Sequence, residues 1–299
     1  MSENLNDLSL ITFPGAPNLP IFAADENGYF REFGLRVDHE TTTSSPYQIE
    51  NLVAQKFQIA GTALDNVIAY QEGQGAVELP IAPDLFVFMG ATQIELTFAV
   101  AKGIENFEDL RGQTLAMDAL YTGFAFVLYE MLEKNGLKFG DYSIEPVGAT
   151  PHRWESVKSG NHAGTLLIEP FSSMARNQGY KVLAKSGEVC PHYQGGIFTA
   201  SRQWAADNPA LIEGYIRAYL KGLDWCLCPK NYEPAKALLL RRMPAIKPEA
   251  ADNVMKNLLS EKTGLTPLAK IDYEGFRTVL DLRNRFGPEN TSLSEPKAY

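Results

Sequence analysis

The chain has 299 residues, of which 45% are hydrophobic and 21% are charged, and its formal net charge is −9. This length favours about two domains, and the composition is typical of a globular protein. No apolar run approaches the roughly 20 residues of a membrane-spanning helix, and no Lys–Arg cluster predicts binding to nucleic acid.

The first third of the chain alternates strand and helix signals. Apolar alternation predicts a strand over 8–13, which Pro14 and Gly15 end. A helix from Pro20, a strand over 35–42, a helix from Ser45 and a strand over 57–63 follow. In the second helix we expect Ser45 as the N-cap and Pro46 at the first helical position. This βαβαβ order predicts a parallel sheet with right-handed crossovers.

The middle third repeats the same order of elements. Strands are expected from Leu85 and from Glu95, and another ends at Met117. The helix over 121–136 has a clear apolar face, with Gly136 at its C′ position. The next elements are a strand over 142–148, a short helix over 153–160 and a strand over 162–168. The third strand of each series carries the sequence Ala-Gly-Thr, at 60–62 and 163–165, which suggests two equivalent lobes.

The last third is predicted to be helical. Helices are expected over 207–225, 232–243, 247–259 and 272–287, and a polar tail covers 288–299.

Three segments resemble a known family. They are "GAPNLPIFAADENGYFREFGLRVD", "NLVAQKFQIAGTALDNVIAYQEGQG" and "AVAKGIENFEDLRGQTLAM". Together they resemble the NMT1/THI5-like (SsuA/TauA-like) solute-binding proteins of ABC transporters. The resemblance implies an α/β protein of the periplasmic binding protein type II fold. Each of two lobes would have a mixed, mostly parallel sheet flanked by helices, with the ligand cleft between them. Lobe I would comprise 1–92 plus 195–299, and lobe II 93–194.

The candidate ligand-binding residues lie in the loops at the carboxyl ends of the predicted strands, where ligands bind in open parallel sheets. These loops are rich in hydroxyl, amide and aromatic side chains, which suits a small polar solute. The candidates are Asn18, Leu19, Thr43, Ser44, Tyr47, Thr62, Asp65, Asp118, Tyr121, Thr122, Gly123, His152, Arg153, Trp154, Glu169 and Tyr193.

Several of these residues have a structural alternative. Asp65 and Asp118 each precede a helix and could either cap it or accept from a ligand. We expect Asp65 and Glu169 on opposite walls of one cleft, with Glu169 as the favoured ligand contact. Arg153 could anchor a carboxylate or sulfonate, or could be a surface arginine. The aromatic candidates could stack on a planar ligand or pack in the core.

The leading functional hypothesis is a binding protein that closes on an aminopyrimidine, sulfonate, taurine-like or aromatic-acid ligand. The expected partners are this small molecule and an ABC permease; no cofactor, no metal and a monomer are predicted. The alternative is a cytoplasmic enzyme of the same fold, such as a hydrolase, a decarboxylase or a thiamine-pyrimidine enzyme. The family's pyrimidine synthase branch carries a "CCCFC" segment, which is absent here. Without a signal peptide the chain as written is expected in the cytoplasm, and a trimmed mature form would be periplasmic.

Overall fold

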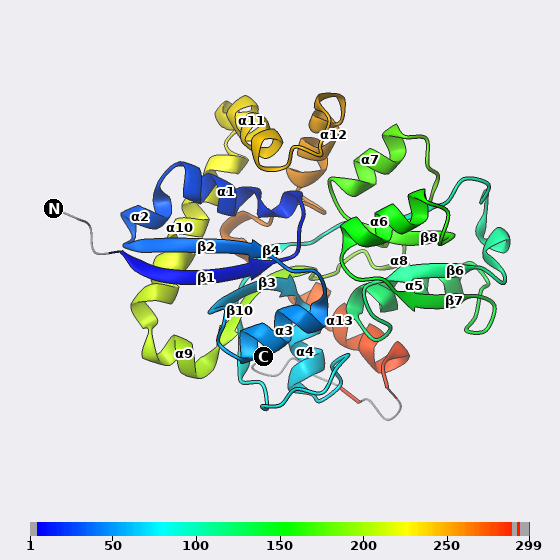
Figure 1. Cartoon of the computed structure of the whole chain (residues 1–299), viewed down its shortest axis with the longest axis horizontal. Coiled ribbons are helices and arrows are strands. Elements are labelled where there is room, and N and C mark those ends of the chain that lie inside the picture. Colours follow the sequence, from blue (N-terminus) through cyan, green and yellow to red (C-terminus); the bar gives the residue numbers. More distant parts are fainter. Residues whose placement is uncertain (1–4, 289–291, 294–298) are drawn as a thin grey trace.

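A computed structural model describes residues 5–288, 292–293 and 299. They form two five-stranded sheets that lie side by side, each flanked by helices (Figure 1). We call each sheet with its helices a lobe. Of the predicted polar tail, residues 289–291 and 294–298 lie outside the described residues. None of the described helices is long and apolar enough to cross a membrane.

The first sheet has the strand order β2-β1-β3-β10-β4. Strand β10 is antiparallel to both of its neighbours, and the other four strands share one direction. The sheet is therefore mixed and mostly parallel, as predicted. Its strands are β1 (Asn6–Thr12), β2 (Leu35–Thr41), β3 (Ile59–Ala63), β4 (Leu85–Thr92) and β10 (Gly196–Ser201).

The second sheet has the order β7-β6-β8-β5-β9, in which β5 is the antiparallel strand. The repeated Ala-Gly-Thr sequence falls on β3 and on the start of β8, which occupy the same position in their sheets. The strands are β5 (Thr97–Val100), β6 (Thr114–Met117), β7 (Ser143–Pro146), β8 (Gly164–Leu167) and β9 (Val182–Lys185).

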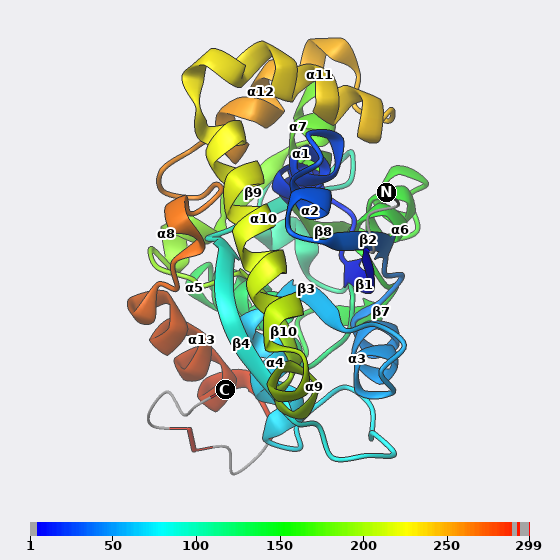
Figure 2. The same ribbon diagram turned by 90° about the vertical axis from the view of Figure 1, so that its left-hand side faces the viewer.

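Helices cover both faces of each sheet, and the long α10 crosses one face of the first sheet (Figure 2). The α-helices are α1 (Leu19–Glu26), α2 (Tyr29–Glu32), α3 (Ser45–Val53), α4 (Leu64–Gln71), α5 (Gly123–Lys134), α6 (Thr150–Lys158), α7 (Phe171–Asn177), α8 (Ser186–Val189), α9 (Arg202–Asp207), α10 (Pro209–Leu227), α11 (Tyr232–Arg242), α12 (Pro248–Leu258) and α13 (Tyr273–Phe286). Single 3₁₀ turns are η1 (Ala16–Asn18), η2 (Phe107–Leu110), η3 (Pro229–Asn231) and η4 (Pro267–Ala269).

Alternation along β1 fills the two faces of the first sheet. Leu8 and Leu10 pack into the core formed with α1 and α10, whereas Ile11 packs on the opposite face with α3 and α4. This is the period of two that a strand imposes on its side chains. The sequence pattern therefore places an apolar layer on each side of the sheet.

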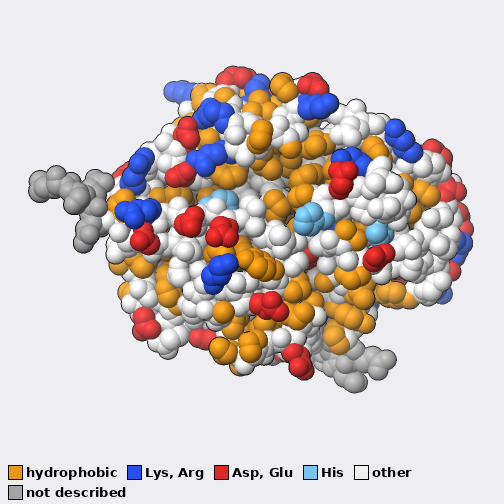
Figure 3. Space-filling model, viewed as in Figure 1, with side chains coloured by type: hydrophobic (Ala, Val, Ile, Leu, Met, Phe, Trp, Pro, Cys, Tyr) orange, Lys and Arg blue, Asp and Glu red, His pale blue; other side chains and the backbone are white. Residues whose placement is uncertain are grey.

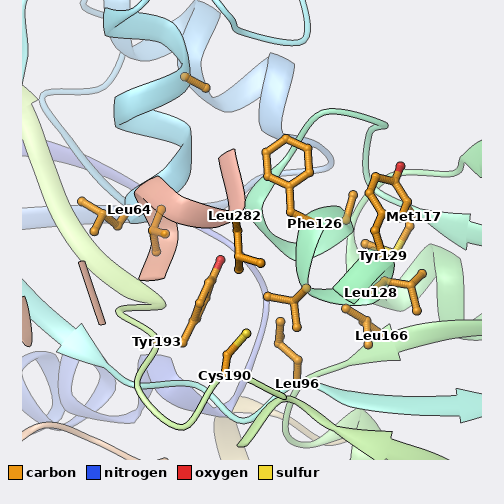
Figure 4. Close-up of a cluster of buried hydrophobic side chains, with 14 of the residues drawn as sticks. Leu64, Leu96, Met117, Phe126, Leu128, Tyr129, Leu166, Cys190, Tyr193 and Leu282 are labelled. Atoms are coloured by element: carbon orange, nitrogen blue, oxygen red, sulfur yellow. The ribbon is translucent and has the colours of Figure 1, made fainter. Parts of the chain in front are cut away.

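The second apolar layer continues from one lobe into the other. Leu64 of α4, Phe126 of α5 and Leu282 of α13 belong to one buried cluster (Figure 4). Helix α13 packs against both α4 and α5, so it contacts both lobes. The division of the chain after residues 92 and 194 stays a prediction.

Two local predictions were wrong in detail, and two strands were missed. The N-cap of α3 is Ser44, whose Oγ accepts from the backbone N–H of Tyr47, so Ser45 is the first helical residue. The helix expected from Pro20 ends at Glu26, because Gly28 adopts a left-handed conformation (φ 74°) that separates α1 from α2. The short strands β9 and β10 were not predicted.

Candidate functional site

A cavity lies between the two lobes, at the carboxyl ends of strands from both sheets. Thr12 ends β1, Thr62 lies near the end of β3, and Asp118 directly follows β6. The space inside it that the centre of a water molecule can reach has a volume of about 90 Å³. The cavity is therefore large enough for several waters or a small solute.

Asp118 bridges the lobes through one oxygen and leaves the other free. Its Oδ2 accepts from the backbone N–H of Ser45 at 3.3 Å and from the Ser45 hydroxyl. Asn66 Nδ2 in turn donates to Ser45 Oγ at 3.2 Å and to Thr62 Oγ1 at 2.8 Å. The buried Oδ1 of Asp118 has no hydrogen-bond partner among the described residues. Asp118 is therefore a lining residue whose second carboxylate oxygen is buried and unpartnered within the described part of the chain.

Arg153 is the second charged side chain among the described lining residues. It is 2% exposed, and its guanidinium donates to Gly148 O, Thr150 Oγ1 and Leu166 O at 3.3, 3.0 and 3.2 Å. Burial lowers the pKa of Arg153 to about 10, and the nearby Asp118 carboxylate opposes this shift. Arg153 is therefore charged at neutral pH. Its Nε has no partner among the described residues.

The rest of the lining combines hydroxyl and amide groups with apolar side chains. The aromatic rings of Phe13, Phe124 and Phe198 contribute to the wall. Thr92 Oγ1 is buried without a hydrogen-bond partner among the described residues. A few polar groups in a largely apolar wall are typical of small-molecule sites, where they orient the ligand. The other polar lining residues are Thr12, Asn18, Thr122 and Thr150.

Six of the sixteen predicted site residues line this cavity. They are Asn18, Thr62, Asp118, Thr122, Gly123 and Arg153. The remaining ten do not: Leu19, Thr43, Ser44, Tyr47, Asp65, Tyr121, His152, Trp154, Glu169 and Tyr193.

The two acids expected to face each other across the cleft are both engaged elsewhere. Asp65 is fully buried, and its two oxygens accept from Arg283 at 2.7 and 2.6 Å. Asp65 lies in the first turn of α4 rather than at its N-cap, which is Ala63. Glu169 lines a smaller neighbouring cavity, where Arg176 and Asn257 donate to it. The expectation of opposed walls was therefore wrong.

Several other candidates have structural positions. Trp154 is buried against Tyr180, with ring centroids 4.7 Å apart, and Leu19 lies in the core. The backbone oxygen of Thr43 accepts from Ala149 N across the lobes. Tyr193 is buried beside Gly123, at which an added Cβ would lie 2.6 Å from the Tyr193 hydroxyl. Of the remaining four, Ser44 is the N-cap of α3, and Tyr47, Tyr121 and His152 are exposed.

Sequence reasoning missed Ser45 and Asn66, which connect Asp118 to the first lobe. Asn66 directly follows Asp65, but successive helix residues point about 100° apart, so the two side chains face different surroundings. Asn66, in the first turn of α4, instead donates through Nδ2 to Thr62 Oγ1 near the end of β3. No helix or strand period relates these two residues, because the chain changes from strand to helix between them.

No three His, Cys, Asp or Glu side chains within the described ranges are grouped so that they could hold a metal ion. On the face drawn in Figure 3, acidic and basic side chains are interspersed over the surface.

The family model described as NMT1/THI5 like matches residues 17–231. Among curated proteins, YtlA of Bacillus subtilis is 24% identical over 225 residues and the riboflavin-binding protein RibY of Chloroflexus aurantiacus is 24% identical over 250 residues. These alignments cover 69% and 79% of this chain. They span 61% and 66% of the two relatives, respectively.

Solved structures share the fold. The periplasmic nitrate-binding protein NrtA from Synechocystis PCC 6803 has a TM-score of 0.79 and 16% identity, over 96% of this chain and 83% of its own. The alkanesulfonate-binding protein SsuA from Xanthomonas axonopodis pv. citri, bound to MOPS, has a TM-score of 0.75 and 15% identity, over 95% and 94%. The fold is therefore that of periplasmic binding proteins. Because the family model covers well over half of the 299 residues, the chain belongs to the NMT1/THI5-like family.

Proposed function

We propose that the protein is the substrate-binding component of an ABC importer and binds a small polar solute between its lobes. The observation that carries this proposal is the interlobe cavity with the unpartnered Oδ1 of Asp118. A structural relative from Staphylococcus aureus is described as the ligand-binding component of an ABC-type import system, which supports the same role here. The partner would be the permease of such a system.

We further propose that the ligand carries an N–H donor, as an aminopyrimidine does. A buried carboxylate oxygen without a partner favours a donor and repels an anion. The phenyl rings of Phe13, Phe124 and Phe198 suit a planar heterocycle. The guanidinium of Arg153 already donates to three protein acceptors, and its unpartnered Nε is left to donate to an acceptor atom of the same ligand, such as a ring nitrogen. A zwitterion such as a taurine-like ligand would need both charged residues.

The test is a ligand panel measured by thermal shift and native mass spectrometry. Aminopyrimidines should raise the melting temperature and be recovered with unchanged mass, whereas sulfonates, nitrate and aromatic acids should have smaller effects. Asp118→Asn should weaken aminopyrimidine binding by at least about tenfold, because it removes a hydrogen bond to a charged group.

Asp281→Asn is the matched control, since Asp281 is exposed on α13. It should leave the affinity unchanged. Stronger binding of an anion than of any aminopyrimidine would contradict the ligand class, and conversion of a ligand to product would contradict the binding role.

A further inference from the structure

Glu169 has protein donors on both of its carboxylate oxygens. Oε1 accepts from Ser173 Oγ at 3.0 Å, from the Arg176 guanidinium at 3.2 Å and from Asn257 Nδ2 at 2.6 Å. Oε2 accepts from the backbone N–H of Ser173 at 3.3 Å. The side chain is only 12% exposed. This carboxylate is thus held by the protein itself.

The contact between Asn257 and Glu169 joins the two lobes. Asn257 is on α12, whose buried residues Val254 and Met255 pack into the core of the first sheet. Glu169 lies between β8 and α7, and α7 packs on the second sheet through Phe171. The backbone oxygen of Glu169 also accepts from Ala16 N of η1, at 3.0 Å.

This part of the lobe interface differs in chemistry from the part around α13. At α4, α5 and α13 a continuous apolar cluster spans both lobes, so separating them there would expose buried side chains to water (Figure 4). Between α12 and α7 the contact includes the hydrogen bond from Asn257 to Glu169, whose groups water can satisfy when they separate. The second contact therefore costs less to break.

Neither Asn257 nor Glu169 lines the main cavity. Both line the smaller cavity beside it, which shares Pro17, Thr92, Ile94 and Ile168 with the main one. A group that holds the two lobes together without touching the ligand changes the fraction of ligand-free molecules whose lobes are closed. The apparent dissociation constant equals the intrinsic constant divided by that fraction, so the change is the same for every ligand.

We propose that the Asn257–Glu169 hydrogen bond is a latch that sets the affinity for all ligands by one common factor, while Asp118 distinguishes between ligands. This inference rests on the proposed binding function. It assigns Glu169 and Asn257 as positioning residues, while Ser173 and Arg176 of α7 hold the Glu169 carboxylate within its own lobe.

The experiment compares Asn257→Ala with Asn253→Ala, a control that removes an exposed asparagine from the same helix. Isothermal titration with two or more panel ligands should give dissociation constants that rise by a common factor of about three to ten in Asn257→Ala. Small-angle scattering of the ligand-free protein should show a larger radius of gyration for Asn257→Ala than for the control. Thermal unfolding checks that both variants are folded.

A second variant, Asn257→Asp, places a carboxylate against Glu169. Repulsion should open the lobes further than Asn257→Ala does, and lowering the pH should reverse the effect, because one of two close carboxyls then takes up a proton. An effect of Asn257→Asp that does not depend on pH would count against the latch.

The outcomes separate the two proposals. Unequal factors for different ligands would mean that Asn257 contacts the ligand, and unchanged affinities with an unchanged radius would exclude a latch. If no ligand binds the wild-type protein, the proposed function fails. The scattering difference between Asn257→Ala and Asn253→Ala still tests the latch in that case.

Discussion

At the scale of single residues, Asp65 and Asp118 have the same side chain in different surroundings. Asp65 is fully compensated by the Arg283 guanidinium, whereas Asp118 is held through one oxygen by Ser45, and its other oxygen has no partner in the part of the chain that the structure describes. A satisfied buried charge is structural, and an unsatisfied one needs a partner. This difference supports the role in ligand recognition that we propose for Asp118.

His39 supports the cavity wall from behind. Its Nε2 lies 2.8 Å from the Oγ1 of Thr12, which lines the cavity. Burial, together with the charge of Arg242, lowers the pKa of His39 from 6.5 to about 4. A neutral His39 is therefore part of the folded structure over most of the acidic range.

The lowered pKa predicts a pH dependence of stability. The unfolded chain takes up a proton at His39 near pH 6.5, but the folded protein does so only near pH 4. The free energy of unfolding should therefore fall as the pH drops from 6.5 to 4, by up to about 3 kcal/mol from this group. Urea unfolding at several pH values should show a shallower fall for His39→Gln. The exposed His152→Gln is the control, and equal slopes in both variants would contradict this role of His39.

At the scale of elements, the starts of helices present much of the site. The start of α5 contributes Thr122, Gly123 and Phe124 to the cavity wall. The start of α6 contributes Thr150 and Arg153, and α3 contributes its first residue, Ser45. The cap of α3 therefore positions the residue that holds Asp118.

Ser44→Ala should remove this cap. Loss of the hydrogen bond from Tyr47 N to Ser44 Oγ should lower the free energy of unfolding by about 1 kcal/mol. Ser44→Thr keeps a hydroxyl and should retain most of the stability. Urea unfolding measures both, and equal destabilisation by the two variants would show that the hydroxyl is not the source of the effect.

At the scale of the whole molecule, α13 holds the two lobes together. Arg283 forms a fully buried ion pair with Asp65 and also donates to Gln74 Oε1 and to the backbone oxygen of Tyr121. Its guanidinium lies 5.0 Å from the ring centroid of Phe126. The Tyr121 contact places Arg283 next to the segment that forms the cavity wall.

Breaking this pair from one side should be costly. Arg283→Met leaves Asp65 buried without its partner and should lower the free energy of unfolding by about 3–5 kcal/mol. The double variant Asp65→Leu/Arg283→Met removes both charges and should be more stable than Arg283→Met alone. Urea unfolding of the three proteins measures this. A double variant less stable than the single one would mean that packing, rather than the unpaired charge, dominates.

Local patterns predicted much of the fold. Helix α5 agrees with the apolar face and the C′ glycine that were predicted for it. The buried face comprises Val127, Leu128, Met131 and Leu132, and the left-handed Gly136 follows the helix. The order of strands and helices through the first two thirds of the chain was also largely predicted from the sequence. These features depend on residues a few positions apart, which the helix and strand periods relate directly.

The strand β10 and the choice between the two aspartates depend on distant parts of the chain. Strand β10 completes the first sheet between β3 and β4, more than a hundred residues after either. Arg283 reaches Asp65 across 218 positions, and Ser45 reaches Asp118 across 73.

The sequence alone therefore predicted a two-lobed α/β protein, because the order of strands and helices follows from local periodicity. Only the tertiary structure decided that Asp118 faces the cavity, that Asp65 is neutralised and that Glu169 bridges the lobes. The physical reason is that a buried charge is defined by the groups brought against it, and folding brings those groups from distant segments.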